Sequence, residues 1–424
     1  MDTLDKYDRT NSEAFQRVSV LDVYAARLLM FSFFLPEKLQ SFVTILVGVY
    51  FVFRSFRAKF SVPRSNYLWA ALLGSLYFLY LFSIPFTPPE YKHFLSLLCE
   101  RKLSLLLLPL VFALTGQPFR LAIINELRFF VYGCLVSCMV GNADFVYHSW
   151  LAHDSIHALS HVRYRIIFES CTGIHPTYMG VFLGFSICIT LLSTAFVGRR
   201  GQVMQYAIVY VLLVLLLALL AKSPIIALIF IGGHYAYRRR QALLRYKMAL
   251  AGFFASVIAA CFFIPFIGQR LREVLQFAGI GKSGNVADNS VYVRKLLWTV
   301  DTDLIKQYWL TGVGAGRLLH ILRERYFFYS IANHFPVGYF DPHNEYFSEW
   351  LSFGLLGIAV FVTMLTVHFV RAIRMRHYLY LYMLIILYIT FSTETLLSRQ
   401  EGVLFYSVFT SLFFFSARRL EDRR

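Results

Sequence analysis

Long apolar stretches alternate with short polar segments along most of this chain. An α-helix rises about 1.5 Å per residue, so a hydrocarbon layer of about 30 Å needs roughly 20 apolar residues to span it. This pattern predicts an all-α polytopic membrane protein with about twelve transmembrane helices. The predicted spans lie at about residues 18–36, 38–55, 67–86, 104–118, 128–147, 178–198, 203–221, 223–237, 248–268, 348–370, 378–396 and 403–417.

The longest polar segment falls between the ninth and tenth predicted spans, at residues 269–347. A loop of this length is uncommon unless it is functional. We therefore expect a large, partly helical loop domain here. The chain then divides into spans one to nine with their connecting loops (1–268), the loop domain (269–347), and spans ten to twelve with a C-terminal tail (348–424).

Basic residues gather in five clusters between the apolar stretches. Cytoplasmic loops of membrane proteins are enriched in Lys and Arg, and twelve spans with both termini in the cytoplasm place every cluster on the cytoplasmic side. The loop domain then faces away from the cytoplasm. The clusters are Arg54/Arg57/Lys59/Arg64, Arg199/Arg200, Arg238–Arg240 with Arg245/Lys247, Arg371/Arg374/Arg376, and Arg418/Arg419 with Arg423/Arg424.

The composition agrees with a lipid environment. Hydrophobic residues make up 58% of the chain and charged residues 15%, whereas a soluble domain carries about 25% charged residues. The net charge of +17 could indicate nucleic acid, but its confinement to short clusters favours membrane topology and no nucleic-acid partner. The six cysteines show no metal-ligand spacing, so we expect neither a metal centre nor a disulfide framework.

A histidine marks the end of the loop domain. His343 and Asn344 stand just before the tenth predicted span, and nine residues separate them from Gly354-x-x-Gly357, whose glycines would allow close helix packing. A histidine with an ordinary pKa near 6.5 can accept a proton from a hydroxyl at neutral pH. His343 is therefore a candidate general base; the alternative is a structural histidine that caps the helix.

The His-Asn-x9-Gly-x-x-Gly pattern after a long outer loop resembles the O-antigen ligase and O-antigen polymerase superfamily. The run Thr311–Gly316 is similar to the glycine run of that family, in which we single out Gly314 and Gly316 as site support. The resemblance covers residues 221–357 by motif. It implies a GT-C-like membrane fold and a metal-independent, inverting glycan transfer with His343 as base and Asn344 as its support.

The resemblance also implies cations that bind the donor's diphosphate. The family has an arginine ahead of its histidine, which Arg294 matches, and an arginine where this chain reads Ala221-Lys222-Ser223-Pro224. Lys222 keeps the charge but lacks the bidentate geometry of arginine. The alternatives are an exposed Arg294 in ordinary salt bridges and a Lys222 that extends to the membrane interface from a helix end.

Other polar residues of the outer face are weaker candidates. Arg163 and Arg165 could add to an anionic pocket, or they could form a solvated basic loop. His175 and Tyr178 stand at the start of the sixth predicted span, where a substrate contact and a structural helix start are equally open. Glu394 is an acid at membrane depth, and such acids are functional or paired.

Two further histidines, His153 and His157, are spaced i, i+4 like a metal pair. No third ligand stands at a recognisable spacing, so we expect no metal. Glu394 has Arg294 and Arg399 as candidate partners.

The resemblance implies transfer of an undecaprenyl-pyrophosphate-linked O-antigen to a sugar hydroxyl of lipid A–core, at the periplasmic face of a bacterial inner membrane. No cofactor is expected. One alternative is an O-antigen or exopolysaccharide polymerase, or a protein glycosyltransferase, of the same superfamily. Another is a polysaccharide transporter or flippase, which would favour repeats and polar sites near the bilayer midplane; this chain shows no repeat.

Overall fold

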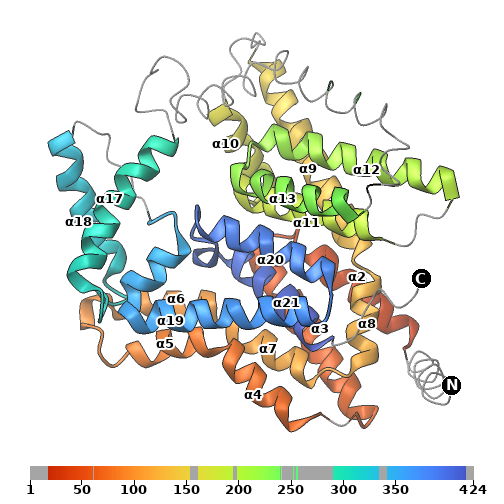
Figure 1. Ribbon diagram of the computed structural model, residues 1–424, viewed down its shortest axis with the longest axis horizontal. Coiled ribbons are helices and arrows are strands. Elements are labelled where there is room, and N and C mark those ends of the chain that lie inside the picture. Colours follow the sequence, from red (N-terminus) through yellow and green to blue (C-terminus); the bar gives the residue numbers. More distant parts are fainter. Residues whose placement is uncertain are drawn as a thin grey trace.

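The computed structural model describes residues 18–60, 62–152, 161–193, 198–238, 290–333 and 341–416, with residues 240, 252 and 255. Every regular element in these segments is a helix, which confirms the predicted all-α class (Figure 1). The ninth predicted span (248–268), the first part of the loop domain and both termini fall largely or wholly outside the described residues.

The helices follow one another closely along the chain. They are α2 (Val20–Ser32), α3 (Glu37–Arg57), α4 (Arg64–Leu73), α5 (Ser75–Ser83), α6 (Pro89–Lys102), α7 (Ser104–Leu114), α8 (Gln117–Asn125), α9 (Arg128–Leu151), α10 (His161–Thr172), α11 (Pro176–Leu192), α12 (Gly198–Leu219), α13 (Lys222–Arg238), α17 (Ser290–Tyr308), α18 (Leu318–Asn333), α19 (Glu345–Arg374), α20 (Tyr378–Phe391), the 3-10 helix η3 (Leu396–Ser398) and α21 (Gln400–Phe415).

Four helical segments in the described part of the chain are long and apolar enough to cross a membrane: Glu37–Arg57, Gln117–Leu151, Arg200–Leu219 and Glu345–Arg374. Two further pairs would bring the count to six if each pair is one bent span. In one, α4 and α5 meet at 55° after Gly74; in the other, α10 and α11 meet at 76°. Several of the twelve predicted spans therefore correspond to helices that are broken or shorter than a full span.

Three of the basic clusters lie at the same end of the helix bundle. Arg371 near the end of α19 donates from Nε to the Phe414 carbonyl at the end of α21 (2.8 Å). Helix α4 begins at Arg64 of the first cluster, and its Trp69 contacts the Phe414 ring (5.4 Å between centroids). Arg238 of α13 lies 3.8 Å from the centre of the ring of Tyr378, which follows α19. Figure 1 shows α17 and α18 at the opposite end of α19.

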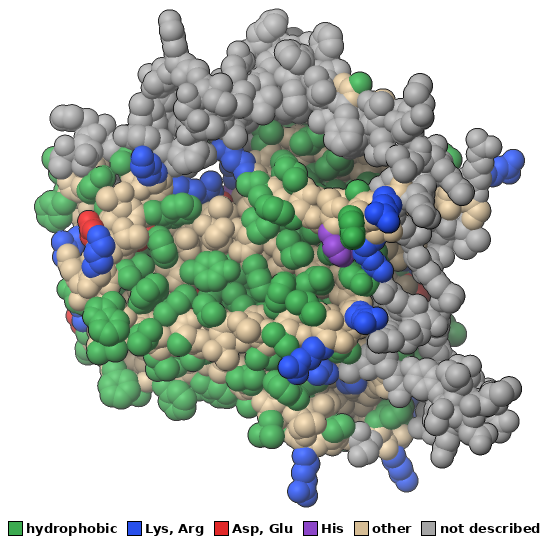
Figure 2. Space-filling model, in the orientation of Figure 1, with side chains coloured by type: hydrophobic (Ala, Val, Ile, Leu, Met, Phe, Trp, Pro, Cys, Tyr) green, Lys and Arg blue, Asp and Glu red, His purple; other side chains and the backbone are tan. Residues whose placement is uncertain are grey.

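Large apolar side chains cover much of the outer surface, whereas in water-soluble proteins most such side chains are buried. Phe42 and Phe53 of α3 are 62% and 60% exposed, and Phe230 of α13 is 64% exposed. Figure 2 shows such side chains spread over the middle of the molecule, with Lys and Arg mostly toward its edges. Exposed apolar patches of this extent mark contact with lipid or partners, and the chain is a membrane protein.

Helix α19 is interrupted at Gly354, where φ is +65°. The Leu355 N–H donates to the Leu310 carbonyl (3.2 Å), and the Val313 N–H donates to the Leu351 carbonyl (2.7 Å). Backbone groups released by the break are thus satisfied by the loop after α17, as a membrane helix requires. We call this pair of hydrogen bonds the glycine clasp.

The glycine clasp needs glycine on both sides. A Cβ on Gly354 would lie 2.1 Å from the Leu310 carbonyl oxygen, and a Cβ on Gly312 would lie 2.6 Å from the Gly354 nitrogen. The expectation that Gly354 and Gly357 serve helix packing is wrong for Gly354, whose partner is a loop backbone. Gly357 sits in the bend, where a Cβ would meet the Glu349 carbonyl oxygen of its own helix at 2.3 Å.

Candidate functional site

His343 lies in a short turn directly before α19, with a left-handed backbone (φ +45°). Its N–H donates to Asp341 Oδ1 (3.0 Å), and the Thr395 hydroxyl donates to the other oxygen of that carboxylate. Left-handed φ is uncommon for a residue with a side chain and is often found at functional sites. Asp341 therefore stabilises a strained turn that directs the imidazole.

The imidazole of His343 contacts a carboxylate that also binds Arg294. His343 Nδ1 lies 3.0 Å from Glu394 Oε2, and Arg294 Nη2 donates to Glu394 Oε1. The side chains of His343, Arg294 and Glu394 are 29%, 21% and 11% exposed, respectively. We call these three residues the His343 triad. Glu394 lies beyond the end of α20 at Phe391, in the turn before η3, rather than within a span.

Two carboxylates change the proton affinity of His343. Burial of the ring disfavours the charged form, but the hydrogen bond and charge of Glu394, with the charge of Asp341, outweigh burial and raise the pKa of His343 above its ordinary value. A proton on Nδ1, facing Glu394, leaves the basic lone pair on Nε2. This is the arrangement by which a carboxylate orients a catalytic histidine.

Asn344 and Trp298 hold this turn in place. Asn344 caps α19 through its side-chain oxygen, which accepts from the Phe347 N–H (3.2 Å), and its amide donates to the Ser392 carbonyl (3.2 Å). Trp298 of α17 donates from Nε1 to the Pro342 carbonyl (3.1 Å). Asn344 therefore caps α19, and His343 does not.

His175 and Tyr178 lie at the same end of the bundle as the triad. The Tyr178 hydroxyl donates to the Thr395 carbonyl (3.3 Å), next to Glu394. His175 caps α11 through Nδ1, which accepts from the Thr177 N–H (3.3 Å), and its Nε2 lies 3.2 Å from Arg165 Nη2. Both residues thus have structural contacts beside the triad.

The other predicted cations, Arg163 and Lys222, are located through the helices that carry them. Arg163 is half-buried on α10, two residues before Arg165. Helix α13 runs antiparallel to α20, because His234 near its end lies 2.8 Å from the Tyr382 hydroxyl near the start of α20. Lys222, the first residue of α13, therefore lies toward the end of α20 that precedes Glu394.

The two glycines predicted as site support have different surroundings. Gly314 has φ +90°, and a Cβ there would meet nothing within 4 Å. Gly316 packs against α6, since its Cβ would lie 3.3 Å from the Tyr91 carbonyl oxygen and 3.4 Å from Leu95 Cβ. His153 and His157 lie outside the described residues. Among the described residues, no three His, Cys, Asp or Glu side chains are grouped so that they could hold a metal ion.

A cavity of about 520 Å³ opens beside His343. Its wall comes from α5, α6, the run Thr311–Gly316, α18, the His343 turn, the start of α19 and the segment around η3, so it lies between the bundle and the loop domain. The lining residues are Tyr80, Phe94, Leu98, Arg101, Lys102, Ala315, Leu318, Leu319, Arg323, Asp341, Pro342, His343, Glu345, Ser348, Ser352, Thr395, Ser398 and Arg399. A volume of this size is typical of small-molecule sites.

Sequence reasoning missed four basic residues of this wall as site residues. Arg101 and Lys102 end α6, Arg323 lies on α18, and Arg399 follows η3 and pairs with Glu169 (2.8 Å) rather than with Glu394. The signal for the first two was the charged run Glu100-Arg101-Lys102 between two apolar stretches. Arg323 stands in a similar run, Arg323-Glu324-Arg325, but the sequence does not show which of these side chains faces a cavity.

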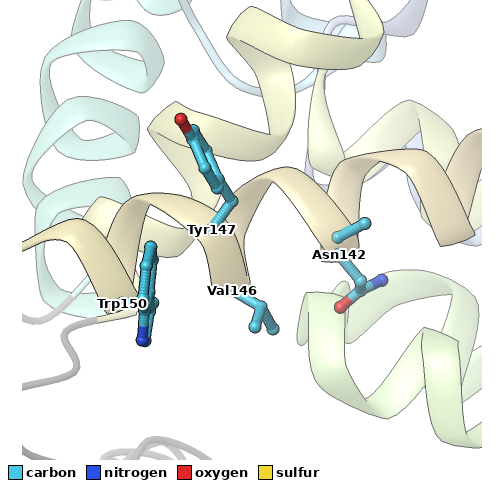
Figure 3. Close-up of a pocket in the computed structure, with 5 residues that line it drawn as sticks. Asn142, Val146, Tyr147 and Trp150 are labelled. Atoms are coloured by element: carbon cyan, nitrogen blue, oxygen red, sulfur yellow. The ribbon is translucent and has the colours of Figure 1, made fainter.

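A second hollow, on the surface of α9, has no such chemistry. It is lined by Asn142, Ala143, Val146, Tyr147 and Trp150. Figure 3 shows that the labelled side chains all project from one helix, and that no charged group is among them. This apolar hollow is typical of a lipid-facing surface.

The comparison with known families bears on the part of the chain around the triad. Residues 207–362 match the family model described as O-antigen ligase. The matched range contains Arg294 and His343 of the triad, the glycine clasp and Lys222, while Glu394 lies beyond it. No curated protein sequence matches the chain. The match confirms the resemblance to the O-antigen ligase superfamily.

Proposed function

We propose that this protein of the O-antigen ligase superfamily transfers a glycan from undecaprenyl pyrophosphate to a sugar hydroxyl of lipid A–core. The observation that carries the proposal is the His343 triad, whose imidazole lies in the wall of a cavity, in a chain whose residues 207–362 match the O-antigen ligase model. The reaction takes place on the periplasmic side of the bacterial inner membrane.

In the proposed reaction His343 Nε2 accepts the proton of the acceptor hydroxyl. The hydroxyl oxygen then forms the bond to the anomeric carbon, and the bond from that carbon to the diphosphate oxygen breaks with its electron pair on the diphosphate. The configuration at the anomeric carbon inverts. Base catalysis of this kind contributes about 10²–10⁴-fold in rate.

Cations near the triad offset the charge of the leaving diphosphate. Arg294 is the nearest, because it shares the Glu394 carboxylate with His343. Lys222, Arg163 and Arg165 are proposed to extend this positive region. Lys222 starts α13 toward the end of α20 that precedes Glu394, and Arg165 of α10 contacts His175, at the start of the helix whose Tyr178 contacts Thr395. A charge held in place before reaction stabilises the transition state without reorganisation.

The pH dependence tests the role of the imidazole. Only neutral His343 can accept a proton, so transfer should rise with pH through a midpoint above the ordinary value of 6.5. Glu394→Gln removes the carboxylate that raises the pKa of His343, and we expect it to move the midpoint to lower pH. The measurement is kcat/KM against pH for both proteins. A midpoint that does not move would contradict the link between Glu394 and the base.

The charge of Arg294 is tested by substitution. Arg294→Gln should lower kcat by about 10²-fold, the effect of removing one group that stabilises transition-state charge. Arg294→Lys should recover only part of it, because lysine lacks the two-pronged geometry. Lys295→Gln, at the exposed next position of α17, is the control and should transfer at the wild-type rate. Equal rates for all three variants would remove Arg294 from the mechanism.

The function itself is tested with the purified full-length protein, a lipid-linked glycan donor and lipid A–core. Formation of glycan-bearing lipid A–core supports the ligase. Elongation of the donor glycan in place of transfer to lipid A–core would support the polymerase. Movement of the donor across vesicles without any new glycosidic bond would contradict a transferase and support a flippase.

A further inference from the structure

The cavity beside His343 has more basic than acidic side chains in its wall. Apart from His343, four of its side chains are basic and two are acidic. They are Arg101, Lys102, Arg323, Arg399, Asp341 and Glu345. These six side chains differ in their contacts within the protein and in their exposure.

Lys102 is neutralised within the protein. It is buried, and its Nζ lies 3.1 Å from Glu349 Oε1 and 3.7 Å from Glu345 Oε1. The Tyr80 hydroxyl donates to the same Glu349 oxygen (2.7 Å). Lys102 therefore ties α6 to the start of α19, and its charge is shared with two carboxylates.

Arg399, Asp341 and Glu345 of the wall also have partners within the protein. Arg399 pairs with Glu169. Asp341 accepts from the His343 N–H and the Thr395 hydroxyl, and Glu345 Oε2 accepts from the Leu397 N–H (2.8 Å). The carboxylates of the wall are thus engaged with the protein, which leaves them poorly suited to bind the hydroxyls of a neutral sugar.

Arg101 of α6 and Arg323 of α18 are exposed arginines of the cavity wall, as is the Glu169-paired Arg399. Arg101 forms no ion pair with any residue that the structure describes. The wall between them is apolar, with Phe94 and Leu98 on one helix and Leu319 on the other. A guanidinium offers two parallel N–H donors to a phosphate or carboxylate, so this rim suits an anion.

We propose that Arg101 and Arg323 bind an anionic group, a phosphate or a carboxylate, on the acceptor glycan. The inference rests on the proposed function, in which His343 takes the proton of the acceptor. The described wall of the cavity contains His343 but neither Glu394 nor Arg294. The acceptor hydroxyl therefore enters from the cavity, while the donor's diphosphate lies toward Arg294, on the other side of the ring.

Steady-state transfer by the purified full-length protein tests this subsite, with phosphorylated lipid A–core and with the same acceptor after chemical dephosphorylation. Arg101→Gln and Arg323→Gln should each raise the KM for the phosphorylated acceptor about 10- to 100-fold, the effect of losing a charge-assisted hydrogen bond. The KM for the donor should not change. With the dephosphorylated acceptor, wild type and variants should have the same, raised KM.

Arg325→Gln is the matched control, because Arg325 is an exposed arginine of α18 outside the cavity wall. It should behave as wild type. A rise in the donor KM, with the acceptor KM unchanged, would assign the two arginines to the donor's diphosphate and overturn the proposal. No change in either KM would overturn it too.

A binding measurement separates this proposal from the proposed function. Phosphorylated core oligosaccharide, released from lipid A, is titrated calorimetrically into the wild type, Arg101→Gln and Arg325→Gln. Weaker binding by Arg101→Gln alone supports the anion subsite, even if wild type transfers no glycan to lipid A–core and the ligase proposal fails. Equal binding by all three proteins contradicts the subsite, whatever the transfer assay shows.

Discussion

Replacing His343 with alanine should lower glycan transfer by about 10²–10⁴-fold while the protein still inserts and folds. The loss follows from the removal of the imidazole that Glu394 orients at the cavity wall (3.0 Å between Nδ1 and Oε2). Transfer to lipid A–core is measured with purified protein at saturating donor and acceptor. The effect should fall on kcat, because the proton is removed in the transition state rather than on binding.

The backbone at His343 requires a second variant. Its φ of +45° is strained for alanine, whereas asparagine adopts this conformation more readily. His343→Asn should therefore keep the turn and still lose transfer. His93→Ala, at an exposed position of α6, is the control for a histidine that lies outside the site. Wild-type transfer by His343→Asn would show that the imidazole is not the base.

Replacing Gly354 with alanine should destabilise the protein by about 4 kcal/mol or more, which is exceptional for a single substitution. The new Cβ would lie 2.1 Å from the Leu310 carbonyl oxygen, a backbone atom that a rotamer change cannot move, and φ is +65°. Breaking the glycine clasp would release the loop after α17 from α19. The midpoint of thermal unfolding in detergent, together with the yield of folded protein, measures the effect.

Gly232→Ala on α13 is the matched control for this prediction. A Cβ at Gly232 would meet nothing within 4 Å, and alanine is the better helix former by about 1 kcal/mol. The control should unfold at or above the wild-type temperature. If Gly354→Ala unfolded at that temperature as well, the tight contact between the two backbones would not exist in the folded protein.

The helical class and the position of His343 followed from the sequence, because each depends on local pattern. Apolar stretches of nearly a span's length predict helices, and α3 and α19 cover the predicted stretches 38–55 and 348–370. His343 and Asn344 are adjacent to the start of α19, so their place at its entrance is also a local property. The superfamily was likewise predicted from the motif around His343, and the family match at residues 207–362 confirms it.

Helix ends and breaks were harder to predict. The apolar pattern continues through Gly74 and past Phe391, yet α4 and α5 meet at an angle of 55° and α20 ends at Phe391. Hydropathy reports how well a segment suits lipid, and it does not report where the backbone hydrogen bonds change partner. The break at Gly354 shows the same limit, since the backbone groups around it bond to a loop about 40 residues earlier in the chain.

The sequence by itself determined that this chain is helical and suited to a membrane, and that a histidine stands where the loop domain meets the tenth predicted span. Only the tertiary structure decided which groups surround that histidine. Glu394 is 51 residues from His343 and 100 residues from Arg294, and Lys102 is 247 residues from Glu349. Local periodicity carries no information on such pairs, because they form only when packing brings distant helix ends together.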